Sequence, residues 1–267
     1  MTTPAGKYFV NPLVALVTAN TREMLFRRNV ILPLSVALLP VLALALIRAG
    51  GVRGAVPDAG GDGGYELYAV LCASFYLQFL VPLLALLKGL SIFSREQEEG
   101  TLIYLFIRPV PRIILIAGKF LAFWISTSII VLLSLGAAYL LLGGIAGLNG
   151  VAENFGVFTK DVGVLCLGLG AYGAALMTVG VLVKRSLGVG ILLLAWDMVA
   201  TYIPGSTYLL TVKYYLQSIF PHQRTEPGLI ALLSYHPPAS LTQSMLTLIG
   251  VLVVGIGLST FLITVKE

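Results

Sequence analysis

The chain has 267 residues, of which 58% are hydrophobic and only 11% are charged, and its mean hydropathy is +0.95. This composition lies far outside the range of soluble domains and indicates a protein that resides in a lipid bilayer. The net charge of +5 comes from basic residues that are spread along the chain. They form no compact patch, which argues against a nucleic-acid partner.

Six long apolar runs predict six transmembrane helices. They cover residues 30–49, 67–90, 116–142, 162–183, 187–203 and 240–264. These runs approach the roughly 20 residues that a spanning helix needs, and the alternating pattern of an outer-membrane barrel is absent from the sequence. We therefore expect an all-α, polytopic membrane protein. It divides into an N-terminal segment, residues 1–29, and a six-span domain, residues 30–267.

The N-terminal segment predicts an amphipathic helix. Asn11 is suited to the N-cap and Pro12 to the first helical position. The less polar stripe comprises Leu13, Leu16, Val17, Asn20 and Met24, whereas Thr18, Arg22 and Glu23 lie away from it. This pattern is typical of a helix that lies in the membrane interface. A cytosolic extension of the first span is the alternative.

The distribution of lysine and arginine predicts the orientation. With both termini in the cytoplasm, twelve of the 17 basic residues lie inside: Lys7, Arg22, Arg27, Arg28, Lys88, Arg95, Arg108, Arg112, Lys119, Lys184, Arg185 and Lys266. The others lie outside: Arg48, Arg53, Lys160, Lys213 and Arg224. Because cytoplasmic loops carry an excess of basic residues, we expect a multi-pass protein of the cytoplasmic (inner) membrane with both ends inside.

Two predicted external loops differ in character. Residues 50–65 are rich in glycine and have no hydrophobic period, so they predict a flexible connection. Residues 204–239 are long and amphiphilic. Such a segment can enter the outer leaflet as short helices if its backbone groups are buried in protein.

Several motifs suggest chemistry that their context does not support. The segment GLGAYG, Gly168–Gly173, matches a dinucleotide-binding pattern but lies inside a predicted span, where small residues favour close helix packing. His222 and His236 have no third ligand nearby in the sequence, so no metal site is predicted. Cys72 and Cys166 fall inside predicted spans and are expected to be packing residues.

Asp197 is a charged residue near the middle of the fifth predicted span. An ionised carboxylate costs about 3 kcal/mol or more in a membrane unless it is paired, hydrated or protonated. One interpretation is therefore a site on a transport pathway. The other is a structural aspartate that is hydrogen-bonded to a hydroxyl such as that of Thr201, or to a neighbouring helix.

A polar segment, SREQEEGTLIYLFIRPVPR at residues 94–112, lies in the predicted cytoplasmic loop 91–112 between the second and third spans. Arg95 and Glu99 are four residues apart and can share a helix face. Gly100 can end that helix, and Pro109 and Pro111 prevent a smooth helix into the third span. The segment predicts a short helix, over about 92–100, that docks on a soluble partner.

This loop resembles the cytoplasmic signature of ABC type-2 transporter permeases. The residues that carry the resemblance are Glu96, Glu98, Gly100, Thr101, Leu102, Arg108, Pro109, Val110, Arg112, Gly118 and Lys119. The segment TREMLFRRNVIL is similar to the charged entry helix of that family, with Arg22 and Glu23 in it. The segment YHPPASL resembles members grouped with copper-enzyme-maturation and gliding permeases, although the basic tail of many members is missing after Lys266 and Glu267.

The resemblance implies a permease subunit of an ATP-driven exporter. Its partners would be a second permease subunit, identical or homologous, and a dimer of cytosolic ABC ATPases that carries the ATP and magnesium. The chain contains no G-x-x-x-x-G-K-[ST] loop, so we expect no ATPase site on it. The residues expected to couple to the ATPase are Arg95, Glu96, Glu98, Glu99, Gly100, Thr101, Arg108, Pro109 and Arg112.

Two other functions remain open from the residues alone. A proton-coupled secondary transporter could use Asp197 without any ATPase. A membrane scaffold that transports nothing could use the polar loop only to recruit a partner.

Overall fold

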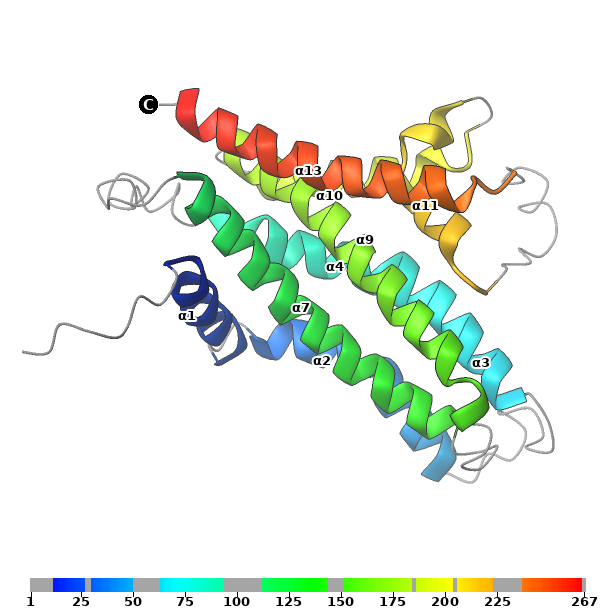
Figure 1. The fold of residues 1–267 in the computed structure, drawn as a ribbon. Helices are drawn as coiled ribbons and strands as arrows, with labels where there is room; N and C mark the ends of the chain where they lie inside the picture. Colours follow the sequence, from blue (N-terminus) through cyan, green and yellow to red (C-terminus); the bar gives the residue numbers. More distant parts are fainter. Residues whose placement is uncertain are drawn as a thin grey trace, which may run out of the picture.

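The computed structural model describes residues 12–26, 30–49, 63–93, 112–143, 151–183, 186–203, 206–222 and 237–265 (Figure 1). The elements, in chain order, are α1 (Pro12–Phe26), α2 (Ile31–Ala49), α3 (Gly63–Leu71), η2 (Cys72–Leu80), α4 (Val81–Leu84), η3 (Ala85–Gly89), α7 (Arg112–Gly143), α9 (Phe155–Leu182), α10 (Ser186–Ala200), η4 (Thr207–Leu210), α11 (Val212–Ile219) and α13 (Leu241–Val265). All regular structure in these ranges is helical, which confirms the all-α prediction.

Four helices of the described chain are long and apolar enough to cross a membrane. They cover Tyr65–Phe93, Ile113–Leu142, Phe155–Leu182 and Leu241–Val265, and they match the second, third, fourth and sixth predicted spans. The first and fifth predicted runs form helices whose apolar parts are shorter, Ile31–Leu46 and Ser186–Ala200. The full count of six spans therefore stays a prediction.

The second span, Tyr65–Phe93, is one long helix that contains two π-helical segments. These segments, η2 and η3, lie on either side of the short α4. Pro82 in α4 has no backbone N–H and cannot make the hydrogen bond of a regular helical residue. π-Helical segments, whose turns are wider than those of an α-helix, are rare and are often found at functional sites.

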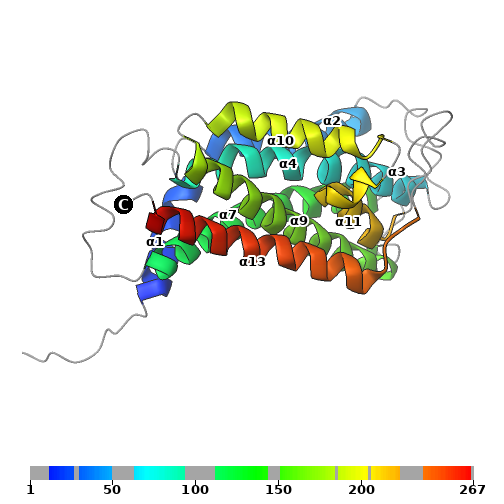
Figure 2. The same ribbon diagram turned by 90° about the horizontal axis from the view of Figure 1, so that it is seen from above.

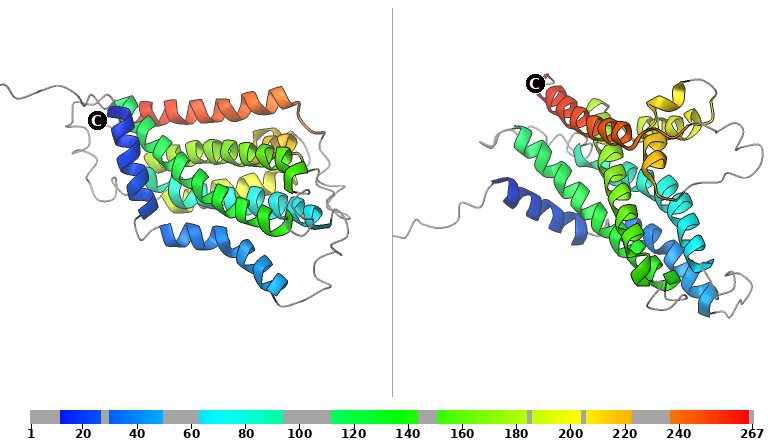
Figure 3. Two further views of the ribbon diagram at one scale, coloured as in Figure 1. Left: turned by 60° about the horizontal axis from the view of Figure 1, so that its bottom comes forward. Right: turned by 45° about the vertical axis from the view of Figure 1, so that its right-hand side comes forward.

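Helix α9 lies in the middle of the bundle and contacts α7, α10, α11, α13 and the second span. Figure 3 (left) shows α2 and α13 on opposite sides of it. The buried apolar residues form two clusters. The larger one runs through the second span, α7, α9 and α11, and the smaller one joins Phe93 to α7, α9 and α13.

Glycines in α9 allow its neighbours to approach closely, as the sequence predicted for the GLGAYG segment. A Cβ on Gly173 would lie 2.2 Å from Cε1 of Phe123 in α7. A Cβ on Gly170 would lie 3.0 Å from Leu252 in α13. The Phe123 ring leaves room only for a hydrogen atom at Gly173, and Leu252 packs closely on Gly170, so the segment packs helices together.

The long helices run between two ends of the bundle, which we name by one residue each. The Phe93 end contains Phe93, the start of α7, and the C-terminal ends of α9 and α13. The Asp161 end contains α3, the start of α9, and α11. Figure 2 shows α1 running across the direction of the long helices, at the Phe93 end.

Candidate functional site

Most of the predicted coupling segment lies outside the described residues. This applies to Arg95, Glu96, Glu98, Glu99, Gly100, Thr101, Arg108 and Pro109. Arg112 is described as the first residue of α7, without its side chain. The structure instead describes the two helices that enter and leave the segment.

These two helices contact each other directly at the Phe93 end. The Nζ atom of Lys119, in the first turns of α7, lies 4.9 Å from the centroid of the Phe93 ring, and both side chains are buried. A cation above an aromatic ring is attracted by the ring's negative face, more strongly where water is excluded. The last described residue of the second span is thereby held against the start of α7.

An apolar cluster surrounds this contact. Its buried members are Ile92, Phe93, Ile116, Phe120, Phe123, Ala174, Met177, Val181 and Ile263. They come from the second span, α7, α9 and α13. A close-packed core transmits displacement because it has few voids. A movement of residues 94–111 would therefore reach four helices through one contact region.

Helix α1 packs on α7 beside this cluster. A Cβ on Gly118 would lie 2.6 Å from Cδ2 of Leu16, so the side chain of Leu16 packs directly on the glycine. Ser126 in α7 donates a hydrogen bond to the sulfur of Met24, at 3.7 Å. Leu16 and Met24 belong to the predicted stripe, and Arg22 and Glu23 are exposed as predicted. The position of α1 in a membrane interface stays a prediction.

The sequence predicted that Asp197 lies near the middle of the fifth span. In the structure it lies in the last turn of α10. Its Oδ2 accepts a hydrogen bond from the hydroxyl of Tyr172 in α9, at 2.5 Å. Its Oδ1 accepts a hydrogen bond from the backbone N–H of Val212, at 2.8 Å. Both oxygens are satisfied, although Asp197 is only 6% exposed.

The contact with Val212 gives Asp197 a structural task. Val212 is the first residue of α11, whose N-cap residue makes no side-chain capping bond. The first N–H groups of a helix have no partner within it and favour a negative charge. Asp197 therefore caps α11 from another helix. The expectation of short helices in 204–239 is met by η4 and α11, and the backbone at the start of α11 is satisfied by protein.

Thr201, which the sequence offered as a partner of Asp197, makes hydrogen bonds to two other residues. Its Oγ1 donates to the carbonyl of Met198 at 2.9 Å and accepts from Nζ of Lys213 at 3.4 Å. The same Nζ lies 4.9 Å from the centroid of the Tyr202 ring. Lys213, which is 6% exposed, thus has an oxygen and an aromatic face around its charge.

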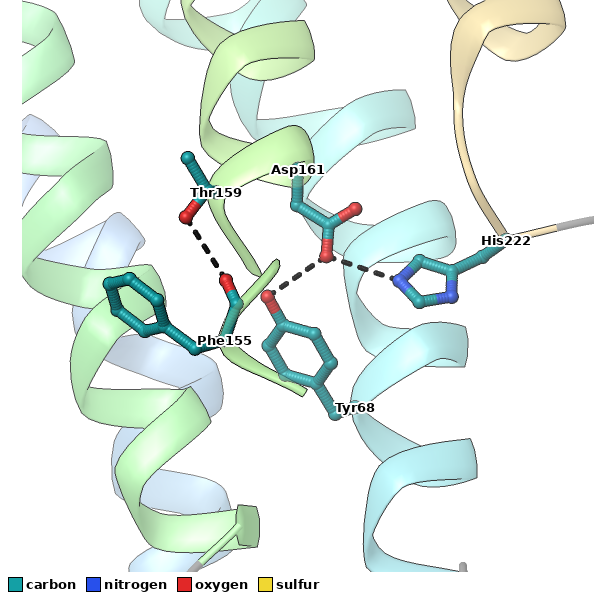
Figure 4. A network of polar contacts seen from close by, with 5 residues as sticks. All are labelled: Tyr68, Phe155, Thr159, Asp161 and His222. Carbon is teal, nitrogen blue, oxygen red and sulfur yellow. Dashed lines mark hydrogen bonds and ion pairs between the residues drawn. The ribbon is translucent and has the colours of Figure 1, made fainter. Parts of the chain in front are cut away.

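A second buried carboxylate, Asp161, was not recognised from the sequence. Its side chain is completely buried in α9. Its Oδ2 accepts hydrogen bonds from the hydroxyl of Tyr68, at 3.1 Å, and from Nε2 of His222, at 3.1 Å. Figure 4 shows the three side chains converging from α9, α3 and the segment after α11. The other oxygen, Oδ1, is buried and has no hydrogen-bond partner among the residues that the structure describes.

The cysteines and histidines that the sequence analysis considered are placed as follows. Cys72 is a free thiol in the core and Cys166 is a free, half-buried one. His222 lies in the network above, and His236 is outside the described residues. Within the described ranges, no three His, Cys, Asp or Glu side chains are grouped so that they could hold a metal ion.

Comparison with known families gives one match over nearly the whole chain. Residues 10–265 match the family model described as ABC-2 family transporter protein. No curated protein matches the chain.

Proposed function

The chain belongs to the ABC-2 family of transporter proteins and is a membrane permease subunit of an ABC transporter, and on this premise we propose that it forms the translocation path of an exporter. ATP would be bound, with magnesium, by a dimer of cytosolic ABC ATPases on separate chains. A second permease subunit, identical or homologous, would complete the path. Six spans would cross the cytoplasmic membrane, with α1 lying in its interface.

The proposed orientation has the Phe93 end in the cytoplasm and the Asp161 end outside. The Phe93 end carries Lys88 and Lys119 and both connections to the segment 94–111. Twelve of the 17 lysines and arginines of the chain belong to the side that this orientation makes cytoplasmic. The charge distribution along the chain therefore supports this orientation over its inverse.

The segment 94–111 would be the coupling element between the ATPase and the membrane helices. The observation that carries this proposal is the buried contact of Lys119 with Phe93, which joins the two helices bordering the segment. Glu96, Glu98 and Glu99 would engage basic or amide groups of the ATPase. Charge-assisted hydrogen bonds of this kind contribute about 1.5 to 3 kcal/mol each where water is excluded.

The packing at the Phe93 end offers a route by which contact of the segment 94–111 with the ATPase could move the membrane helices. ATP-driven closure must favour one membrane conformation over another, because a ligand shifts an equilibrium only by its differential affinity. A push on the segment would reach α7, α9 and α13 through the apolar cluster around Phe93. Closely packed helices respond by small sliding movements.

Charge reversal tests the proposal. The double variant Glu98→Lys and Glu99→Lys should lose copurification with the ATPase, or should abolish the dependence of transport on ATP, while membrane insertion is retained. The matched control is Glu66→Lys with Glu153→Lys, which reverses two exposed acids at the other end. Normal copurification, ATP turnover and transport in the first variant would make residues 94–111 a simple connector.

A further inference from the structure

The Asp161 network joins three parts of the chain through buried side-chain hydrogen bonds. Tyr68 belongs to the start of the second span, Asp161 to α9, and His222 to the segment that leaves α11. Both donors use the same oxygen of Asp161. Loss of either donor would leave the buried carboxylate with less compensation, so the three side chains act as a unit.

The network is also incomplete. Asp161 Oδ1 is buried without a hydrogen-bond partner in the described part of the chain, whereas most buried polar atoms in proteins have one. A carboxylate can accept hydrogen bonds on both oxygens, and here the two described donors share one of them. Separating Tyr68 and His222 from Asp161 therefore breaks two hydrogen bonds.

Aromatic rings place the His222 side chain in this network. Its imidazole lies 5.7 Å from the ring of Tyr65, 6.1 Å from that of Tyr68 and 5.2 Å from that of Phe220, centroid to centroid, and in each case the rings meet edge to face. Phe220 and His222 both follow α11 directly. The network therefore fastens the exit of α11 to α3 and α9.

One helix connects this network with the opposite end of the bundle. The second span carries Tyr68 near one end and Phe93 at the other. Its two π-helical segments lie between these residues. Because wide turns can be rearranged to α-helical ones by shifting one hydrogen bond register, they allow one end of a helix to rotate relative to the other.

We propose that Tyr68, Asp161 and His222 form a latch that holds the outer end of the bundle closed and opens during the transport cycle. The proposal rests on the function proposed above, because movement at Phe93 would release the latch through the second span. Asp161 is a positioning residue here: it acts on the segment after α11 through His222 and on the second span through Tyr68.

The native thiol of Cys72 reports on the latch. Cys72 lies one helical turn after Tyr68, is completely buried, and becomes the only thiol of the chain in a Cys166→Ser background. In the full chain in lipid nanodiscs, without ATPase, we expect His222→Ala to raise the rate of Cys72 modification by a polar maleimide about tenfold, and Tyr68→Phe to raise it about threefold. Thermal unfolding of the His222→Ala variant, measured beside the labelling, shows whether a faster rate comes from local opening or from a loss of the whole fold.

Tyr65→Phe is the matched control, because it removes a hydroxyl from the same cluster that is not hydrogen-bonded to Asp161. It should leave the rate within about twofold of the parent. Equal rates in the parent, His222→Ala and Tyr68→Phe would overturn the latch.

A second comparison separates a latch from a static contact. With the ATPase bound, ATP hydrolysis should raise the Cys72 modification rate of the parent about fivefold, whereas His222→Ala should be fast with or without ATP. If the Cys72 modification rate of the parent were the same with and without ATP, in a complex that hydrolyses ATP, the opening step would be overturned. Failure of any ATPase to bind the chain counts against the proposed function instead, since the first comparison needs no ATPase.

Discussion

The two ends of the helix bundle are held together by different kinds of contact. At the Phe93 end the helices meet mainly through apolar side chains, glycines and the aromatic contact of Lys119, and hydroxyl bonds from Thr178 in α9 to Gly255 and Ser259 in α13 add to them. At the Asp161 end two buried carboxylates bind hydroxyl, imidazole and backbone donors. Apolar contacts have no preferred direction and survive small shifts, whereas hydrogen bonds weaken steeply with angle. We therefore expect the Phe93 end to slide as a packed body and the Asp161 end to open in steps.

The two buried carboxylates at the Asp161 end, Asp161 and Asp197, also differ from each other. Asp197 has a donor for each oxygen and caps a helix. Asp161 has two donors on one oxygen and, within the described ranges, none on the other. The difference suggests a fixed structural role for Asp197 and a changeable contact for Asp161.

The largest stability effect is expected for Asp197→Leu. It would leave the N–H of Val212 and the hydroxyl of Tyr172 without these acceptors in a buried region, at a cost of about 1 to 3 kcal/mol for each group. Asp197→Asn keeps a carbonyl oxygen and should cost about 1 kcal/mol. Thermal unfolding of the purified chain in detergent measures both. A leucine variant as stable as the parent would contradict the capping role.

The same asparagine variant tests whether Asp197 also serves transport. If it does, Asp197→Asn should lower transport much more than it lowers expression or assembly. Unchanged transport would reject a role on the pathway and leave the capping role.

The next largest effect is expected for Gly173→Ala, which challenges the apolar end. The added Cβ would lie 2.2 Å from the buried Phe123 ring, and overpacking of this kind costs about 1 to 3 kcal/mol. Gly163→Ala is the control on the same helix, because nothing lies within 4 Å of its Cβ position. It should be neutral or stabilising by up to about 1 kcal/mol. Equal unfolding temperatures for the two variants would show that α7 and α9 do not pack as described.

The smallest effect is expected for Lys119→Met, which keeps the length of the side chain but removes its charge from the Phe93 ring. The loss should be about 0.5 to 2 kcal/mol in the free energy of unfolding. Lys160→Met, at an exposed position of α9, should have no measurable effect. If the two methionine variants were equally stable, the contact of Lys119 with Phe93 would contribute nothing to holding the segment 94–111.

Composition and the length of the apolar runs were sufficient to predict an all-helical chain and to locate four long apolar helices. Leu16 and Met24 were assigned from their spacing to the apolar stripe of an interfacial helix, and the structure places both against α7. The glycines of GLGAYG were assigned to helix packing for the same kind of local reason. The π-helical segments η2 and η3 could not be predicted, because an apolar run does not show where the backbone hydrogen-bonding pattern of a helix changes.

The polar contacts could not be predicted because they join distant parts of the chain. Asp161 stands one residue before a predicted span, so it looked like an ordinary loop residue, and His222 follows it by 61 positions. Asp197 was recognised as unusual, but its partners Tyr172 and Val212 depend on how α9 and α11 pack. A charged residue at the edge of a span, together with histidine in a loop on the same side, was the signal that could have been used for Asp161.

Thiol labelling of cysteines placed at the two ends tests the central claim most directly, since the proposed coupling and the latch both require the Phe93 end to be cytoplasmic. In a chain without its native cysteines, a cysteine in 54–62 or at Gln223 should react with a membrane-impermeant maleimide added to intact cells. A cysteine at Gln97 should react only after the membrane is permeabilised. Labelling of the Gln97 position from outside intact cells would contradict the orientation, the coupling segment and the latch together.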